Sequence, residues 1–162
     1  MRPAVQWSPS IPGSEQPALE WLAGRLAPLC DEVALVPFPA GFVNDPEFSD
    51  PIPGLRYEGR TNLCAVLGGE PHDGGEKAAG APATVARSLI VNAHVDVVPP
   101  SEGQAGPFDP LVRGGALYGR GACDDKGQIA AIYEALLLLR ERGVRPAGRL
   151  SIHLVTEEEN GG

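Results

Sequence analysis

The 162 residues carry a formal net charge of −8 and are 43% hydrophobic, enough apolar material for one domain with a real core. This acidity argues against nucleic acid or an anionic membrane as the main partner, because both carry negative charge themselves. No apolar run reaches the length of a membrane span, so a membrane protein is not predicted.

Cysteine usage and the N-terminus bear on location. The three cysteines, Cys30, Cys64 and Cys123, are odd in number, scattered, and form no CxxC pair. This distribution argues against a disulfide framework and against a cysteine-based zinc site. The N-terminus lacks an apolar targeting segment, so we expect a soluble, cytoplasmic protein.

The first half of the chain predicts a helix followed by two strands. Ser14 can cap a helix that runs to about Cys30, because leucines recur within it at helical spacing. The stretches Val33–Phe38 and Thr61–Leu67 have strand composition. Residues 40–59, rich in Pro, Gly and Asp, and the low-complexity residues 68–87 are predicted as loops.

The second half predicts a strand, a helix and another strand. Residues Ser88–Val98 form an almost continuous apolar run, which suits a strand covered on both faces. Leu111–Tyr118 is predicted as a short hairpin around a Gly-Gly pair, and a helix follows from about Gln128 to Arg142. Arg149–Thr156 is the last strand. A strand, a crossover helix and a strand make a βαβ-like unit, so the predicted fold class is α/β.

A histidine and an aspartate lie two positions apart within the apolar stretch VNAHVDVVP. On a strand such positions point to the same face, which would place His94 and Asp96 side by side where burial is costly without partners. Pro99 and Pro100 end this strand, so the pair lies near its carboxyl end, where open α/β sheets carry ligand sites. A structural His–Asp pair in a core explains this short motif equally well.

Two aspartates precede the predicted second helix in the stretch GRGACDDKG. Asp125 and Gln128 match a capping-box pattern, and we assign Asp125 to helix capping. Asp124 precedes the cap and follows a glycine-rich turn that exposes it. A phosphate-binding loop is excluded, because two carboxylates would repel phosphate and the GK[ST] ending is absent.

Three glutamates, Glu157 to Glu159, follow the last strand and precede a Gly-Gly turn. Adjacent carboxylates are usually a solvated cluster. If this strand neighbours the strand of His94, however, then His94, Asp124 and a glutamate converge at one edge. One imidazole with several carboxylates suits Zn²⁺, Mn²⁺ or Co²⁺. For His153, in the middle of the strand, a packed structural role is predicted.

The stretches HVDVVP, YGRGACDDKG and TEEENGG, in this order and spacing, resemble the zinc-dependent aminoacylase/carboxypeptidase family of acetylornithine deacetylase, succinyl-diaminopimelate desuccinylase, glutamate carboxypeptidase and carnosinase type. The resemblance covers about residues 60–162 and implies a partial α/β/α sandwich with a mostly parallel or mixed central sheet. It implies that residues 1–162 are the N-terminal part of a catalytic domain whose lid/dimerisation domain and C-terminal part are absent. We therefore expect this chain alone to be inactive and the complete protein to be a homodimer.

The resemblance also implies a role for each residue of the motifs. His94 and Glu159 would each bind one of two divalent ions, and Asp124 would bridge them. Asp96 would orient His94. Glu158 would be the general base that takes a proton from water.

The implied reaction is hydrolysis of the amide bond of an N-acyl amino acid. The expected cofactor is a pair of Zn²⁺ ions, with Co²⁺ or Mn²⁺ as alternatives, and the expected partner is a small-molecule substrate. The peptide bond between Asp124 and Asp125 is implied to be cis. A dipeptidase or carboxypeptidase of the same family, and a non-catalytic metal-binding or interaction protein, stay open as alternatives.

Overall fold

The computed structural model describes residues 15–41, 44, 57–68 and 87–160. These residues form two α-helices, six strands and a 3-10 helix, in the chain order α1 (Gln16–Leu26), β1 (Glu32–Pro37), β2 (Thr61–Leu67), β3 (Leu89–His94), β4 (Leu111–Arg113), β5 (Ala116–Tyr118), α2 (Lys126–Glu141), β6 (Leu150–Val155) and η2 (Glu158–Asn160). The predicted order of helices and strands is therefore confirmed.

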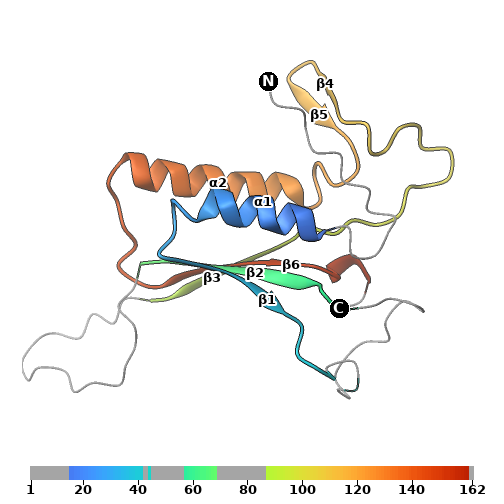
Figure 1. Cartoon of the computed structure of the whole chain (residues 1–162). Helices are drawn as coiled ribbons and strands as arrows, with labels where there is room; N and C mark the ends of the chain where they lie inside the picture. The colour runs from blue at the N-terminus through green and yellow to red at the C-terminus, as the bar shows by residue number, and fades with distance from the viewer. Residues whose placement is uncertain (1–14, 42–43, 45–56, 69–86, 161–162) are drawn as a thin grey trace, which may run out of the picture.

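Four of the strands form one mixed sheet in the order β1-β2-β6-β3. β2 runs antiparallel to both β1 and β6, whereas β3 and β6 are parallel and are joined through α2. The predicted βαβ unit is thus present, and the α/β class with a mixed sheet is confirmed. Both α1 and α2 lie on the same face of this sheet, so the described part of the chain has two layers (Figure 1).

The core lies between the helices and the sheet. Alternate side chains of a strand point to one face, and the alternate residues of β2 and β6 that face the helices are buried. The main contributors from the sheet and the two helices are Leu63, Ala65, Ile152, Leu154, Leu19, Leu26, Ile129 and Leu136. The predicted helical spacing of leucines therefore identified the packed face of the first helix.

The first helix is shorter than predicted. It ends at Leu26 instead of near Cys30, although the backbone N–H groups of Leu29 and Cys30 still donate to the carbonyl of Leu26. This closing turn keeps Leu29 in the core. The predicted cap Ser14 lies outside the described residues, as does most of the two predicted loops.

The second helix begins at Lys126, slightly earlier than predicted, and ends as the sequence indicates. Gly143 has a φ of 61° and follows the helix. The Gly143 N–H donates to Arg140 O at 3.0 Å, and the Val144 N–H donates to Leu139 O at 2.9 Å. These two bonds define the usual glycine stop of a helix. No helix in the described ranges combines the length and hydropathy needed to cross a bilayer.

The strand of the His94 motif differs from its prediction in two ways. β3 ends at His94 and not at Val98, because its neighbour β6 ends at Val155, whose carbonyl accepts one last hydrogen bond from the Val95 N–H. The prediction that both faces of this strand are covered is also wrong for its first half, since Leu89 and Ile90 are exposed. β3 lies at the end of the strand order, which explains this exposure.

The predicted hairpin is present as β4 and β5, with Leu111 opposite Tyr118. It forms a separate two-stranded sheet that projects away from the four-stranded sheet (Figure 1). Its large apolar side chains are exposed. The hairpin therefore adds nothing to the core.

Candidate metal centre

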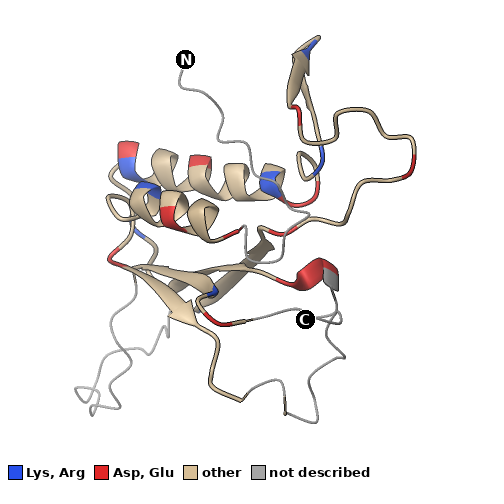
Figure 2. Ribbon diagram, turned by 45° about the vertical axis from the view of Figure 1, so that its right-hand side comes forward, with Lys and Arg blue, Asp and Glu red and all other residues tan. Residues whose placement is uncertain are grey.

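Three chain segments meet at the carboxyl edge of the four-stranded sheet. In the register of β3 and β6, His94 lies opposite Val155, so the ends of both strands lie together. The crossover helix α2 starts at this same edge. Acidic residues mark both η2 and the segment before α2 (Figure 2). The sequence predicted that His94, Asp124 and a glutamate would converge if these two strands were neighbours. The strands are neighbours, so the condition is met.

Three side chains form a group that could hold a metal ion. His94, Asp124 and Glu159 each offer one ligand atom, and these atoms all lie within 4.8 Å of one another. His94 Nε2 lies 2.9 Å from Asp124 Oδ1, and Glu158 Oε2 lies 3.8 Å from the same nitrogen. An imidazole nitrogen with carboxylate oxygens is a ligand set that fits zinc. His153 lies in the middle of β6 and is not part of this group.

The imidazole is buried whereas the carboxylates beside it face solvent. The His94 side chain is 8% exposed, and those of Asp124 and Glu158 are 73% and 60% exposed. An ion or a small molecule could therefore approach from the carboxylate side. The buried ring provides a fixed point against which such a ligand could be held.

Asp96 connects the two sides of this cluster. It lies just beyond the end of β3 and is almost fully buried. Its backbone carbonyl lies 3.2 Å from His94 Nδ1, and its Oδ2 accepts a hydrogen bond of 3.0 Å from the Glu159 N–H. A carbonyl oxygen can only accept, so this contact needs a proton on Nδ1 and leaves Nε2 directed at Asp124. Asp96 thus contacts the histidine, as predicted, and the glutamate segment as well.

The pKa of His94 reflects these neighbours. Burial by itself lowers this pKa, but the hydrogen bond with Asp124 and the negative charge of Asp96 outweigh burial, so the pKa is raised above its ordinary value. The site therefore favours a positive charge at Nε2. A divalent cation supplies such a charge once the proton has left, since metal ligands must be deprotonated.

The capping role predicted for Asp125 is wrong. Asp125 occupies the N-cap position of α2, but its side chain makes no capping hydrogen bond. Its Oδ2 accepts a hydrogen bond of 3.1 Å from the backbone N–H of His94. The next N–H, that of Val95, donates to β6, so the His94 N–H points away from the sheet and needs another acceptor. The Asp124–Asp125 peptide bond is cis, as the resemblance implied.

Sequence reasoning missed a lysine beneath the cluster. Lys126 Nζ donates to the backbone carbonyl of Val95 at 2.8 Å, between the two residues of the His–Asp motif. Burial lowers the pKa of Lys126, and the nearby charge of Asp96 only partly offsets this effect. Gly121 leaves room for the ammonium group, because a Cβ there would lie 2.9 Å from Lys126 Nζ. The glycine-rich turn thus leaves room for the half-buried ammonium group of Lys126.

Sequence reasoning also missed an ion pair behind the glutamate segment. Glu157, grouped above with solvated carboxylates, is buried and pairs with the buried Arg60. Burial raises the pKa of Glu157, and the hydrogen bond from Arg60 counteracts this shift in part. The only hint in the sequence was the position of Arg60 directly before an apolar strand. This position does not indicate that Glu157 is its partner.

The fold and these side chains define an α/β domain with one imidazole and several carboxylates at the carboxyl edge of a mixed sheet, a ligand set that suits borderline divalent metal ions. In the comparison with known protein families, residues 90–162 match the family described as Peptidase family M20/M25/M40. The resemblance inferred from the three motifs is thereby confirmed.

Curated relatives are similar to this chain in sequence, and solved structures are similar to it in fold. The succinyl-diaminopimelate desuccinylase of Methylorubrum extorquens is 36% identical over 158 residues, which are 94% of this chain and 33% of the relative. That of Gluconacetobacter diazotrophicus is 47% identical over 75 residues, 45% of this chain and 19% of the relative. Human carnosine dipeptidase 1 shares the fold at a TM-score of 0.65 and 23% identity, over 96% of this chain and 29% of that structure. The chain spans about a third or less of the length of each of these proteins.

Proposed function

We propose that the full-length protein is a metal-dependent hydrolase that cleaves the amide bond of an N-acyl amino acid. The observation that carries this proposal is the convergence of ligand atoms from His94, Asp124 and Glu159 within 4.8 Å. The desuccinylase relatives support an acylated amino acid as the substrate class. In this proposal residues 1–162 contribute the N-terminal part of the catalytic domain.

The proposed cofactor is a pair of divalent ions, Zn²⁺ first and Co²⁺ or Mn²⁺ as alternatives. His94 and Asp124 would hold one ion, and Asp124 and Glu159 would hold the other. When bound, such ions lower the pKa of water and polarise the scissile carbonyl. The donor set supports this assignment, because imidazole and carboxylate are the ligands that zinc takes from proteins when thiolates are absent.

Glu158 is the proposed general base. Its carboxylate is exposed and lies 3.8 Å from His94 Nε2, so it borders the ligand group without belonging to it. It would take the proton of the attacking water and deliver that proton to the leaving amine. Asp96 would keep the His94 ring in place, with its carbonyl near Nδ1.

Location and assembly complete the proposal. The three cysteines are free thiols, which supports a reducing compartment such as the cytoplasm. A homodimer is proposed from the family resemblance. The partner in the reaction is a small molecule, and the acidic composition supports neither nucleic acid nor an anionic surface as a ligand.

Metal removal tests the proposed function. The full-length protein should lose hydrolysis of N-succinyl and N-acetyl amino acids after treatment with a chelator and regain it with Zn²⁺ or Co²⁺. His94→Ala should not regain activity at the same metal concentration, whereas Arg145→Met, at the opposite end of the sheet, should. Full activity in metal-free protein would contradict the proposal. Faster cleavage of dipeptides would favour the dipeptidase alternative, and zinc binding without any hydrolysis would favour the non-catalytic one.

A further inference from the structure

A second charged group lies behind the candidate metal centre. Arg60 Nη2 donates to Glu157 Oε1 and, at 3.3 Å, to Glu15 Oε2. All three residues are less than 9% exposed, and they come from the start of α1, the start of β2 and the end of β6. Buried ion pairs are weak evidence for stability, because desolvation offsets most of the attraction between the charges. The position of this group therefore calls for another explanation.

Glu157 holds an unusual backbone conformation at the point where β6 turns into η2. Its φ is 76°, which makes it a non-glycine residue in the left-handed region. Such residues persist only where their surroundings hold them. Here the side chain of Glu157 is anchored by Arg60, and its backbone redirects the chain toward Glu158 and Glu159. The ion pair thus fixes the turn that presents the two glutamates.

Three side chains hold the four residues from Thr156 to Glu159. Asn62 Oδ1 accepts hydrogen bonds from the backbone N–H and the hydroxyl of Thr156, at 3.0 and 3.3 Å. Arg60 binds the carboxylate of Glu157. Asp96 Oδ2 accepts the N–H of Glu159 at 3.0 Å. The segment is therefore held before, at and after the turn.

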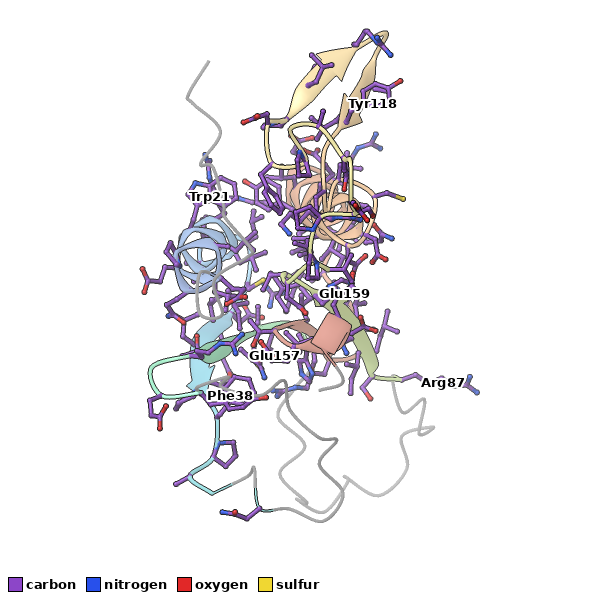
Figure 3. All side chains as sticks on the ribbon, turned by 90° about the vertical axis from the view of Figure 1, so that its right-hand side faces the viewer. Trp21, Phe38, Arg87, Tyr118, Glu157 and Glu159 are labelled. Carbon is purple, nitrogen blue, oxygen red and sulfur yellow. The ribbon has the colours of Figure 1, made fainter. Side chains whose placement is uncertain are left out.

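Glu158 lies between these anchors and has little packing of its own. Its side chain is 60% exposed, yet its Oε2 lies 3.8 Å from His94 Nε2. Backbone position, rather than side-chain burial, must therefore decide where this carboxylate lies. Glu157 and Glu159 lie on different sides of the turn, the first toward β2 and the second nearer α2 (Figure 3).

We propose that Arg60 and Glu157 are positioning residues that hold the turn after β6, so that Glu158 and Glu159 reach the metal centre. This inference rests on the proposed function. It assigns neither residue a contact with substrate or metal. A displacement of about 1 Å at a reacting group can cost about a hundredfold in rate, so a buried anchor one residue away has a measurable effect.

The test compares two substitutions at Glu157 in the full-length protein. Glu157→Met keeps the length of the side chain but removes the acceptor for Arg60, which still has Glu15 as a counter-charge. Glu157→Gln removes the charge and keeps an acceptor oxygen. We expect Glu157→Met to lower kcat about 10–100-fold at nearly constant KM and to weaken zinc affinity about tenfold, the range seen when groups behind metal ligands are lost. Glu157→Gln should stay within about threefold of the wild-type values.

The measurements are zinc affinity by competition with a chromophoric chelator, kcat and KM on an N-succinyl amino acid, and thermal unfolding of the metal-free protein. Arg145→Met, which breaks an exposed ion pair far from the turn, is the control and should match wild type in zinc affinity and kcat. If Glu157→Met does not fold, Arg60→Lys, which keeps the charge and loses the planar fork, takes its place and should show the same losses.

Three results would overturn the inference. A folded Glu157→Met variant with wild-type kcat and zinc affinity would show that the pair serves stability alone. Equal losses in Glu157→Met and Glu157→Gln would show that charge, and not the anchoring contact, is what matters. Wild-type protein that neither binds zinc nor hydrolyses the substrate would overturn the proposed function, and the positioning role with it.

Discussion

Charged side chains are buried at one end of the sheet and exposed at the other. At the carboxyl end of β3 and β6, Asp96 and Glu157 are 2% and 3% exposed. At the other end, Arg145 and Asp31 form an ion pair of 2.5 Å with side chains 61% and 44% exposed. Exposed ion pairs contribute little to the free energy of unfolding, because water already solvates both charges. Buried charges need partners, and the carboxyl end provides them.

The difference shows where this molecule accepts a cost in folding energy. Burying a charge is unfavourable unless hydrogen bonds and opposite charges compensate it. Asp96 receives the N–H of Glu159, and Glu157 receives the guanidinium of Arg60. Each of these bonds fixes part of the turn that carries Glu158. The free-energy cost of burying charges is therefore concentrated where geometry matters for the proposed chemistry. Substitutions at the two ends of the sheet should therefore have different effects.

The largest effect on rate is expected from Glu158→Gln. This change keeps the shape of the side chain and removes its ability to accept a proton, so kcat should fall about 10²–10⁴-fold while both metal ions stay bound. Kinetics and metal analysis of the full-length protein check this. Glu159→Ala should instead lower the metal content. If Glu158→Gln loses metal and Glu159→Ala does not, the roles of the two glutamates are exchanged.

The largest effect on stability is expected in the core that both ends share. Leu154 on β6 is 1% exposed, so Leu154→Ala should lower the free energy of unfolding by about 2–5 kcal/mol. Denaturant unfolding followed by circular dichroism measures this. Leu138→Ala, on the exposed face of α2, is the matched control and should change stability by less than about 0.5 kcal/mol. Equal losses in the two variants would contradict the packing described for β6.

A smaller effect is expected from Asp96→Ala. The change removes the acceptor of the Glu159 N–H and the carboxylate next to the His94 ring, so zinc affinity should fall about 10–100-fold, or about 1.4–2.7 kcal/mol. Competition with a chelator measures this affinity. Asp96→Asn keeps an acceptor oxygen and should lose less. An unchanged affinity in Asp96→Ala would show that the buried aspartate does not support the metal centre.

The smallest effect is expected at the exposed end, from Arg145→Met. The hydrogen bonds from Arg145 and from the Gly68 N–H lower the pKa of Asp31 below its ordinary value of 3.8. A carboxylate with a lowered pKa stabilises the folded state above its unfolded pKa, and this contribution disappears as the pH falls through the folded value. The wild-type and variant unfolding curves should thus differ slightly near neutral pH and converge well below pH 3.8. A difference that persists in acid would mean that Arg145 acts through packing.

Much of the fold was predictable from local pattern. The strand Thr61–Leu67 has the predicted bounds, and the predicted hairpin is also present. The errors lie where partners decide the outcome. β3 is shorter than its apolar run because β6 ends first, and the Asp125 carboxylate binds the His94 N–H instead of capping its own helix.

The sequence by itself determined the order of helices and strands and the identity of the motif residues that converge, because hydrophobic periodicity and short motifs are local properties. Only the tertiary structure decided which charges are buried and what they contact. Arg60 and Glu157 are 97 positions apart, and nothing in the sequence around either residue encodes the other. Their pairing follows from β2 and β6 being neighbours in the sheet, which brings the start of one strand to the end of the other.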